Sequence, residues 1–180
     1  MNFDLQLISL KDDFVTLHPL KPGDFEALYE VASDPLIWEQ HPNKDRYKKA
    51  VFENFFEDAL KSGGAFLILN TKTNQAIGSS RFYEYNELEK TVVIGYTFLA
   101  KDHWGTVYNR ALKKIMIDHA FKFVNVVVFY IGSENIRSQK AISKLGAFKV
   151  GETETEYYGE AKKLNYIYQI KKEDWLETKV

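Results

Sequence analysis

Cysteine is absent from the 180 residues of this chain. Its absence excludes disulfide bridges, thiolate catalysis and zinc–cysteine sites, and it favours a reducing compartment, so we expect a cytoplasmic protein. The 4 histidines are scattered and lack the spacing of a metal-binding motif, so we expect no metal site. Long apolar runs are also missing. No segment approaches the roughly 20 apolar residues of a membrane-spanning helix, so we expect no membrane partner.

Neither sign of charge is in excess, because 24 basic residues nearly balance 25 acidic ones. This balance does not suit nucleic acid as a partner, which attracts strongly basic proteins. The segment Met1–Leu10 carries Asp4 and lacks the basic and apolar regions of a signal peptide. The chain has only 4 prolines and 10 glycines, and no linker rich in them divides it. We therefore expect a single domain over residues 1–180.

The apolar pattern is rich enough for a packed core, with 45% hydrophobic and 15% aromatic residues. It predicts the order β-α-α-β-β-β-α-β-α-β-β. The predicted strands are Phe14–Leu20, Ala65–Asn70, Ala76–Tyr85, Thr91–Leu99, Val126–Ile131, Phe148–Thr155 and Leu164–Lys171. The first predicted helix starts at Pro22–Asp24 and ends at Asp34. The other three predicted helices cover Asp45–Lys61, Tyr108–Phe123 and Ile136–Leu145.

Short connections between the three strands from Ala65 to Leu99 predict antiparallel pairing. The helix between Thr91–Leu99 and Val126–Ile131 is a crossover, which makes these two strands parallel or leaves them splayed side by side. We therefore expect an α+β fold with a mixed, mostly antiparallel sheet and helices on both faces.

One segment that could carry chemistry is the loop before the third long helix, Trp104–Arg110. Backbone N–H groups at a helix N-terminus are unsatisfied and attract anions. Arg110, Lys113 and Lys114 add cations where the helix dipole prefers acids, which makes better sense if an anion binds among them. The alternative is an ordinary solvated loop followed by a solvated basic helix face. The loop is neither a P-loop nor a dinucleotide fingerprint.

A second segment runs from Gly132 to Phe148. Asn135 is a good helix N-cap and Gly146 a good helix stop, so a simple capped helix explains part of it. That alternative does not explain why Arg137, Lys140 and Lys144 gather on the same short helix.

The two segments together resemble the coenzyme-binding motifs of the GNAT superfamily of N-acetyltransferases. Ile94-Gly95-Tyr96 followed by His103-Trp104-Gly105 is similar to the strand and loop of the branch that contains ribosomal-protein N-terminal acetyltransferases. Asn135-x-x-Ser138 and Lys144-Leu145-Gly146-Ala147-Phe148 resemble the helix that follows in that branch. Phe14–Leu20 and Lys21–Asp34 also fit its opening strand and helix, so the resemblance spans nearly the whole chain.

The resemblance implies a GNAT-like fold, acetyl-CoA as cosubstrate and no metal. It places the pantetheine arm on the backbone of Phe98, Leu99 and Ala100. It places the pyrophosphate on Trp104, Gly105, Thr106, Val107, Tyr108 and Asn109, with Arg110 just after. It also assigns coenzyme contacts to Asn135, Ser138 and Lys140, with Ser138 near the sulfur.

Several positions depart from the family pattern. Val107 and Asn109 stand where glycine-type residues are usual, and valine adopts positive φ only at high cost. Either the backbone keeps an ordinary conformation there, or the pyrophosphate fits differently. Ile142 and Val93 occupy positions where many members carry a tyrosine and a glutamate, and neither side chain transfers protons.

The implied reaction is attack of a neutral amine on the thioester carbon. Backbone N–H groups around Phe98–Ala100 are the expected oxyanion donors. Ser138 is the candidate that protonates or solvates the thiolate, and its alternative role is bonding back to Asn135. Glu84 and His41 are the candidate proton acceptors, although His41 also reads as an ordinary loop histidine. Candidate walls of the acceptor pocket are Trp38, Phe82, Tyr83, Tyr157 and Tyr158.

These observations predict an acetyl-CoA-dependent N-acetyltransferase that modifies a primary amine, either a protein N-terminus or a small molecule such as a polyamine or an antibiotic. Two alternatives stay open. One is a CoA-binding domain of this fold without efficient turnover, and the other is an unrelated α+β domain with a chance motif match. A homodimer is left open as the assembly.

Overall fold

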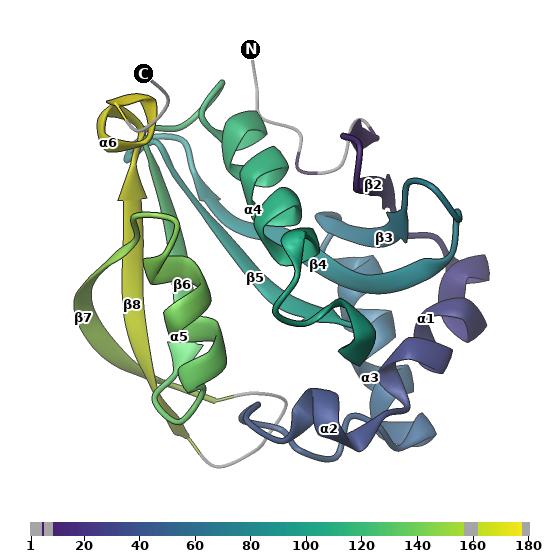
Figure 1. The fold of residues 1–180 in the computed structure, drawn as a ribbon. Coiled ribbons are helices and arrows are strands. Elements are labelled where there is room, and N and C mark those ends of the chain that lie inside the picture. The colour runs from purple at the N-terminus through teal and green to yellow at the C-terminus, as the bar shows by residue number, and fades with distance from the viewer. Residues whose placement is uncertain (1–4, 6–8, 157–161, 178–180) are drawn as a thin grey trace.

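The computed structural model describes residues 5, 9–156 and 162–177, and these form one mixed sheet with helices on both faces (Figure 1). In sheet order the strands are β1 (Leu10–Lys11), β2 (Val15–Pro19), β3 (Ala65–Asn70), β4 (Ala76–Asn86), β5 (Thr91–Leu99), β6 (Val126–Gly132), β8 (Lys163–Lys171) and β7 (Phe148–Thr155). The helices are α1 (Phe25–Ala32), α2 (Pro35–Trp38), α3 (Lys49–Lys61), α4 (Val107–Ala120), α5 (Ile136–Ser143) and α6 (Lys172–Glu177), with 3-10 turns at Pro22–Asp24 and Lys101–His103.

The pairing within the sheet confirms the predicted topology. Strands β1 to β5 pair antiparallel in chain order, and β6, β8 and β7 form a second antiparallel group. The two groups meet only where β5 runs parallel to β6, from Thr91–Val93 against Val126–Val128. Beyond those residues both strands continue without pairing to each other. The crossover through α4 therefore leaves them splayed, as expected, and Figure 1 shows the resulting gap between β5 and β6.

Two apolar clusters hold helices against opposite faces of the sheet. Leu112, Met116 and Ile117 of α4 belong to the cluster on one face, which also takes Ile142 of α5. On the other face, α1, α2 and α3 pack an aromatic-rich cluster that includes Phe98 of β5. Both faces are covered because each long helix carries an apolar stripe at helical spacing.

The helices between β2 and β3 differ from prediction in two places. The helix predicted for Asp45–Lys61 begins only at Lys49, after a turn in which the Lys48 N–H donates to the Asp45 carbonyl at 2.9 Å. A further short helix, α2, was not predicted. Its signal was Asp34-Pro35, read as a helix end, because a proline is also a favoured first residue of a new helix. The Asp34 carboxylate caps this helix by accepting from Leu36 N at 2.9 Å.

Smaller differences lie at the termini of elements. Helix α4 begins at Val107 and ends at Ala120, whereas the pattern predicted Tyr108–Phe123. Strand β1 and helix α6 were not predicted, because two-residue strands and one-turn helices carry too little periodicity to detect. Among the described helices, none is both long and apolar enough to cross a bilayer.

Two irregularities bend the central hairpin of the sheet. The register between β4 and β5 shifts between Ser79 and Arg81 and again between Tyr83 and Asn86. At these shifts, Tyr96 and Glu84 adopt left-handed backbone conformations, with φ of 52° and 49°. A bulge of this kind leaves extra residues unpaired and re-aims their side chains.

Arg81 joins β4 to α3 beneath this hairpin. Its side chain is 3% exposed, and Nη1 lies 2.7 Å from Oδ2 of Asp58. The guanidinium also stacks 3.9 Å from the ring centre of Tyr96. A buried cation is tolerated only when a partner compensates the lost hydration, so this ion pair holds α3 in place.

We therefore expect Asp58→Ala to destabilise the protein by about 2 kcal/mol, less than for a fully buried pair because Asp58 is 40% exposed. The free energy of unfolding in urea measures this. Glu57→Ala is the matched control, since its pair with Lys61 is 3.5 Å long and exposed and should change stability by less than about 0.5 kcal/mol. Equal effects of the two variants would contradict the role of Arg81.

Candidate functional site

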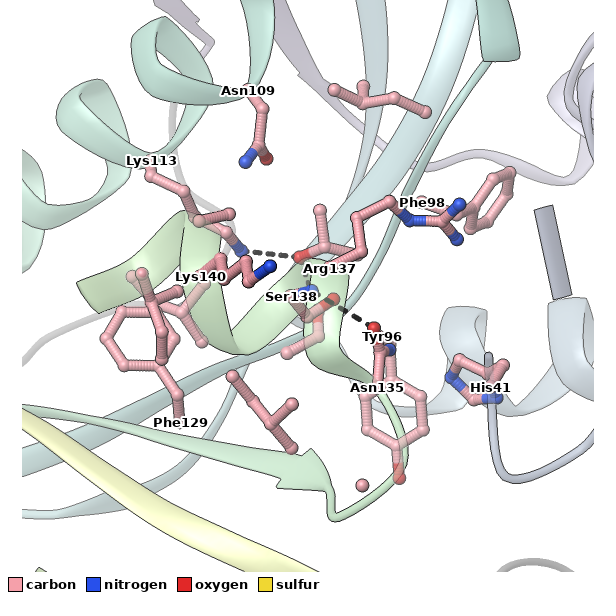
Figure 2. Close-up of a pocket in the computed structure, with 18 of the residues that line it drawn as sticks. His41, Tyr96, Phe98, Asn109, Lys113, Phe129, Asn135, Arg137, Ser138 and Lys140 are labelled. Carbon is pink, nitrogen blue, oxygen red and sulfur yellow. Dashed lines mark hydrogen bonds between the residues drawn. The ribbon is translucent and has the colours of Figure 1, made fainter. Parts of the chain in front are cut away.

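A cavity of about 590 Å³ occupies the gap between β5 and β6, where α4 and α5 begin (Figure 2). It brings together residues that lie far apart in the sequence, from the loop after α2 to the N-terminus of α5. Of the residues proposed from sequence, those that line it are His41, Tyr83, Phe98, Leu99, Trp104, Gly105, Thr106, Asn109, Arg110, Lys113, Asn135, Arg137, Ser138, Lys140 and Lys144. Ala100, Val107, Tyr108 and Glu84 are not among its lining residues.

The loop before α4 forms one wall of the cavity. Gly105 supplies the left-handed conformation in this loop, with φ of 69°, while Val107 and Asn109 have ordinary negative φ. The valine is therefore compatible with the loop, because it is the first residue of α4 and no glycine is needed there. Thr106 caps the helix by accepting from Tyr108 N at 3.5 Å.

Two residues of this loop segment point their side chains elsewhere. Val107 is 50% exposed to solvent. The Tyr108 hydroxyl accepts a hydrogen bond from Asn70 Nδ2 of β3 at 2.9 Å, and its ring contacts Phe14. Any contact of these two residues with a ligand in the cavity would have to come from their backbone.

The strand wall of the cavity is the unpaired length of β5. The Phe98 side chain turns to the opposite face, where its ring lies 4.9 Å from that of Trp38. The Leu99 carbonyl accepts a hydrogen bond from Trp104 Nε1 at 2.8 Å. Because β5 has no strand partner on the β6 side here, its edge is open to an extended ligand.

Helix α5 forms the facing wall. The Asn135 side chain caps it by accepting from Ser138 N at 3.0 Å. Ser138 is thus bonded back to Asn135 through its backbone N–H, which is the structural role that the sequence offered as its alternative. Arg137 stacks 3.8 Å from the ring centre of Trp104 and donates to the Ile37 carbonyl at 3.2 Å, which joins three segments at the rim.

The charge of the cavity lining has one sign. No aspartate or glutamate is among the described lining residues. The lining cations are Arg110, Lys113, Arg137, Lys140 and Lys144. A concave surface with this charge and two helix N-termini favours a polyanionic ligand.

From the sequence, Lys113 is either a cation beside a bound anion or part of a solvated basic helix face. The structure excludes the solvated face, because Lys113 is only 5% exposed. Nζ donates to Thr97 Oγ1 at 2.6 Å across the cavity (Figure 2). Burial lowers the pKa of this amine from its ordinary value to about 7. The sequence did hold a signal for its burial, because Lys113 lies beside Leu112 and three residues before Met116, on the apolar side of α4.

His41 lies in the cavity wall between cations. Its Nδ1 faces the Asn43 N–H at 3.3 Å and its Nε2 faces Arg46 Nη1 at 3.2 Å. Burial, followed by the charges of Arg46 and Arg137, lowers its pKa well below the ordinary value. An imidazole with donors against both nitrogens is poorly placed to accept a further proton.

A smaller cavity of about 260 Å³ adjoins the large one, and it is where Glu84 lies. Tyr83, Tyr96 and Tyr130 line both cavities, so the two spaces share a wall of tyrosine rings. Burial raises the pKa of the Glu84 carboxyl. Of the other proposed pocket walls, Trp38 and Phe82 are core residues that are 1% and 0% exposed. Tyr157 and Tyr158 lie outside the described residues.

The two positions that depart from the family's acid and base pattern are packed in the core. Val93 is 3% exposed and sits on β5 at the last pair with β6. Ile142 is 3% exposed on α5. Neither can exchange protons with a ligand.

The chain was compared with known proteins. A family model described as an acetyltransferase (GNAT) domain matches residues 15–147. No curated protein matches the chain. Solved structures share its fold, among them a candidate acetyltransferase from T. thermophilus, with a TM-score of 0.81 at 24% identity over 96% of this chain and 94% of that one.

Two other similar structures come from Vibrio cholerae. A spermidine N-acetyltransferase in complex with CoA and spermine has a TM-score of 0.69 at 16% identity, over 92% of this chain and 99% of its own. A candidate ribosomal-protein-serine acetyltransferase has a TM-score of 0.75 at 14% identity, over 91% and 97%. At these identities the structures show a shared fold alone. The family model, however, spans well over half of the chain, and this protein therefore belongs to the acetyltransferase (GNAT) domain family.

Proposed function

We propose that this acetyltransferase-family protein moves the acetyl group of acetyl-CoA to a primary amine. The observation that carries the proposal is the large cavity, which opens where β5 separates from β6 and is lined by cations without a carboxylate among the described residues. Coenzyme A suits such a cavity, because it combines a phosphate-rich end with a long, thin arm that can lie along an open strand edge.

The diphosphate would bind at the start of α4. Backbone N–H groups of Gly105–Asn109 are its proposed donors there, and Arg110 follows on the first turn of the helix. Lys140 on α5 and Lys144, the residue that follows this helix, provide further positive charge across the gap. The pantetheine arm would then run back along β5, past Leu99 and Phe98, toward Tyr96.

This path sets the thioester near the bend in β5, between the cavity's two walls. The backbone N–H of Leu99 is the proposed donor to the oxyanion that forms when the amine attacks. The Ala100 N–H, which the sequence also suggested, donates instead to the Ile77 carbonyl of β4 at 2.8 Å. Ser138 on α5 lines the same part of the cavity and is proposed to donate to the departing thiolate. Holding these groups in place would account for most of the rate gain.

The acceptor amine would approach through the smaller cavity. Its tyrosine rings stabilise an incoming ammonium group, and Glu84 is its charged lining residue among those described. Glu84 is our proposed proton acceptor. Partial burial raises the pKa of its carboxyl, which brings it closer to the pKa of the attacking amine and makes the carboxylate a stronger base. His41, with donors against both ring nitrogens, is proposed as a wall residue instead.

The identity of the amine stays a prediction between a protein N-terminus and a small molecule. The resemblance to the ribosomal-protein branch favours the first, and the fold is shared with proteins named for each kind of substrate. A second candidate function is coenzyme binding without efficient turnover. The buried apolar side chains of Val93 and Ile142 favour it, since they leave two proton-transfer positions inert.

Calorimetry tests the coenzyme site. We expect acetyl-CoA to bind, and Arg110→Ala to weaken binding about tenfold at low salt, as expected for the loss of one charge-assisted contact of about 1–3 kcal/mol. The difference should shrink at high salt. Lys114→Ala is the matched control, because Lys114 Nζ pairs with Asp118 at 2.7 Å and does not line the cavity. If Arg110→Ala binds acetyl-CoA as tightly as the parent at both salt concentrations, the proposed position of the diphosphate at the start of α4 is wrong.

Asn135→Asp separates capping from ligand binding. Aspartate caps a helix about as well as asparagine, so thermal stability should change by less than about 0.5 kcal/mol. The variant places an anion in the cavity lining, and we expect the affinity for CoA to fall about tenfold. Calorimetry and thermal melting of the same samples check both parts. A variant that binds CoA as tightly as the parent would make Asn135 a cap and nothing more.

Turnover is tested by thiol release from acetyl-CoA over a panel of peptides and small amines. Once an acceptor is found, we expect Glu84→Gln to lower kcat by about 100-fold with CoA affinity unchanged. The carboxylate form is the base, so the parent should lose activity as pH falls through the raised pKa of Glu84, and the variant should lack that limb.

Glu87→Gln is the control for this variant, because Glu87 lies in the turn after β4 and lines neither cavity. Binding of CoA without thiol release for any amine would favour the domain without turnover.

A further inference from the structure

The amine of Lys113 is buried at the edge of the proposed thioester site, and no contact of the proposed reaction requires it. We propose that Lys113 is a self-acetylation site: acetyl-CoA bound in the cavity transfers its acetyl group to Lys113 Nζ. This inference rests on the proposed function for the position of the donor. It adds a modification site, with an acyl thioester as the reagent, to a position on α4.

The geometry puts the nucleophile beside the strand that would hold the thioester. Nζ lies 2.6 Å from Thr97 Oγ1, and Thr97 stands on β5 between Tyr96 and Phe98. Figure 2 shows the lysine side chain reaching from α4 into the cavity toward this threonine. A donor whose arm follows β5 to the bend at Tyr96 must bring its carbonyl carbon past this amine.

The approach of Lys113 differs from that proposed for the acceptor. Lys113 comes from the face of the sheet covered by α4, where Leu112 and Met116 pack. The smaller cavity is lined by Glu84 and by residues of β4 to β8, and no described residue of α4 lines it. A planar thioester carbon can be attacked from two sides, so the two amines need not compete for one path.

The surroundings of Lys113 hold its amine in a reactive form. A lysine held by a carboxylate stays an ammonium ion, which has no lone pair to attack with, but the described cavity lining contains no carboxylate. Burial lowers the pKa of Lys113 to about 7, so a large fraction of the amine is neutral at physiological pH. The titratable or charged groups that share the cavity are His41, Tyr83, Tyr96, His103, Arg110, Tyr130, Arg137, Lys140 and Lys144, and none of them is a carboxylate.

The reaction balances without a further reagent. The lone pair of neutral Nζ forms a bond to the carbonyl carbon, and the carbon–sulfur bond breaks as the tetrahedral intermediate collapses. The nitrogen loses one proton and the departing thiolate gains one. The products are an amide on Lys113 and free coenzyme A, and the amide is uncharged, so it removes the cost of burying an ammonium group.

Intact-mass and peptide mass spectrometry of the full chain incubated with acetyl-CoA tests the proposal. We expect one acetyl group per chain, mapped to Lys113, and no such group in Lys113→Arg or Lys113→Met. Lys114→Arg is the matched control, and its acetylation should equal the parent's, because Lys114 is exposed and paired with Asp118. Lys113→Met should fold at least as well as the parent, which melting curves check, since it removes a buried ionisable group.

The pH dependence distinguishes this site from ordinary surface lysines. Acetylation of Lys113 needs the neutral amine, so its rate should rise as pH increases through about 7 and then level off. Exposed lysines should keep rising toward their ordinary pKa of about 10.4. In the urea-unfolded chain, Lys113 should be acetylated no faster than the other lysines.

Failure of this inference is separable from failure of the proposed function. If calorimetry shows acetyl-CoA binding while Lys113 stays unmodified, or is modified no faster than Lys114, the self-acetylation proposal is overturned and the coenzyme site stands. If acetyl-CoA does not bind, both are overturned. Modification that persists at the same rate in the unfolded chain would likewise overturn it, because the cavity would then play no part.

Discussion

The short parallel contact between β5 and β6 is the constraint on which the rest of the structure depends. Three residue pairs, from Thr91–Val93 against Val126–Val128, join two antiparallel groups of strands. The cavity exists because this contact stops early while both strands continue. Helices α4 and α5 each begin next to the gap, so their N-terminal N–H groups and the cations on their first turns point into the same space. One limited pairing thus creates the cavity and gathers basic residues around it.

Sequence patterns predicted the sheet and its helices because the deciding signals are local. Apolar spacing marked α4, and Asn135 marked the start of α5. Helix α5 ends at Ser143, before the predicted Leu145, because a glycine signals the end of a helix only to within a residue or two. The splayed strands followed from one crossover between Thr91–Leu99 and Val126–Ile131, since chain connectivity alone limits how such strands can meet. Helix α2 was missed because Asp34-Pro35 signals both an end and a beginning.

The site was harder to predict because its chemistry depends on distant neighbours. The loop and α5 residues could be proposed from their motifs, and most of them line the cavity. Tyr108 could not be excluded from sequence, since only the fold brings Asn70 within reach of its hydroxyl. Lys113 shows the same limit. Its position next to Arg110 and Lys114 allows both a solvated helix face and a cation beside an anion, and only the packing of α4 against β5 buries it. Contacts between residues far apart in the chain decide such cases.

The left-handed backbone at Glu84 and Tyr96 has a consequence for how this protein can change over generations. Each residue holds a conformation that costs a side-chain-bearing residue about 1 kcal/mol or more and costs glycine almost nothing. Substitution by glycine would relieve this strain at both positions. At Tyr96, however, glycine would also remove the ring that stacks 3.9 Å from the Arg81 guanidinium, which offsets the gain. A lineage that no longer used the smaller cavity would therefore acquire glycine more readily at position 84 than at position 96.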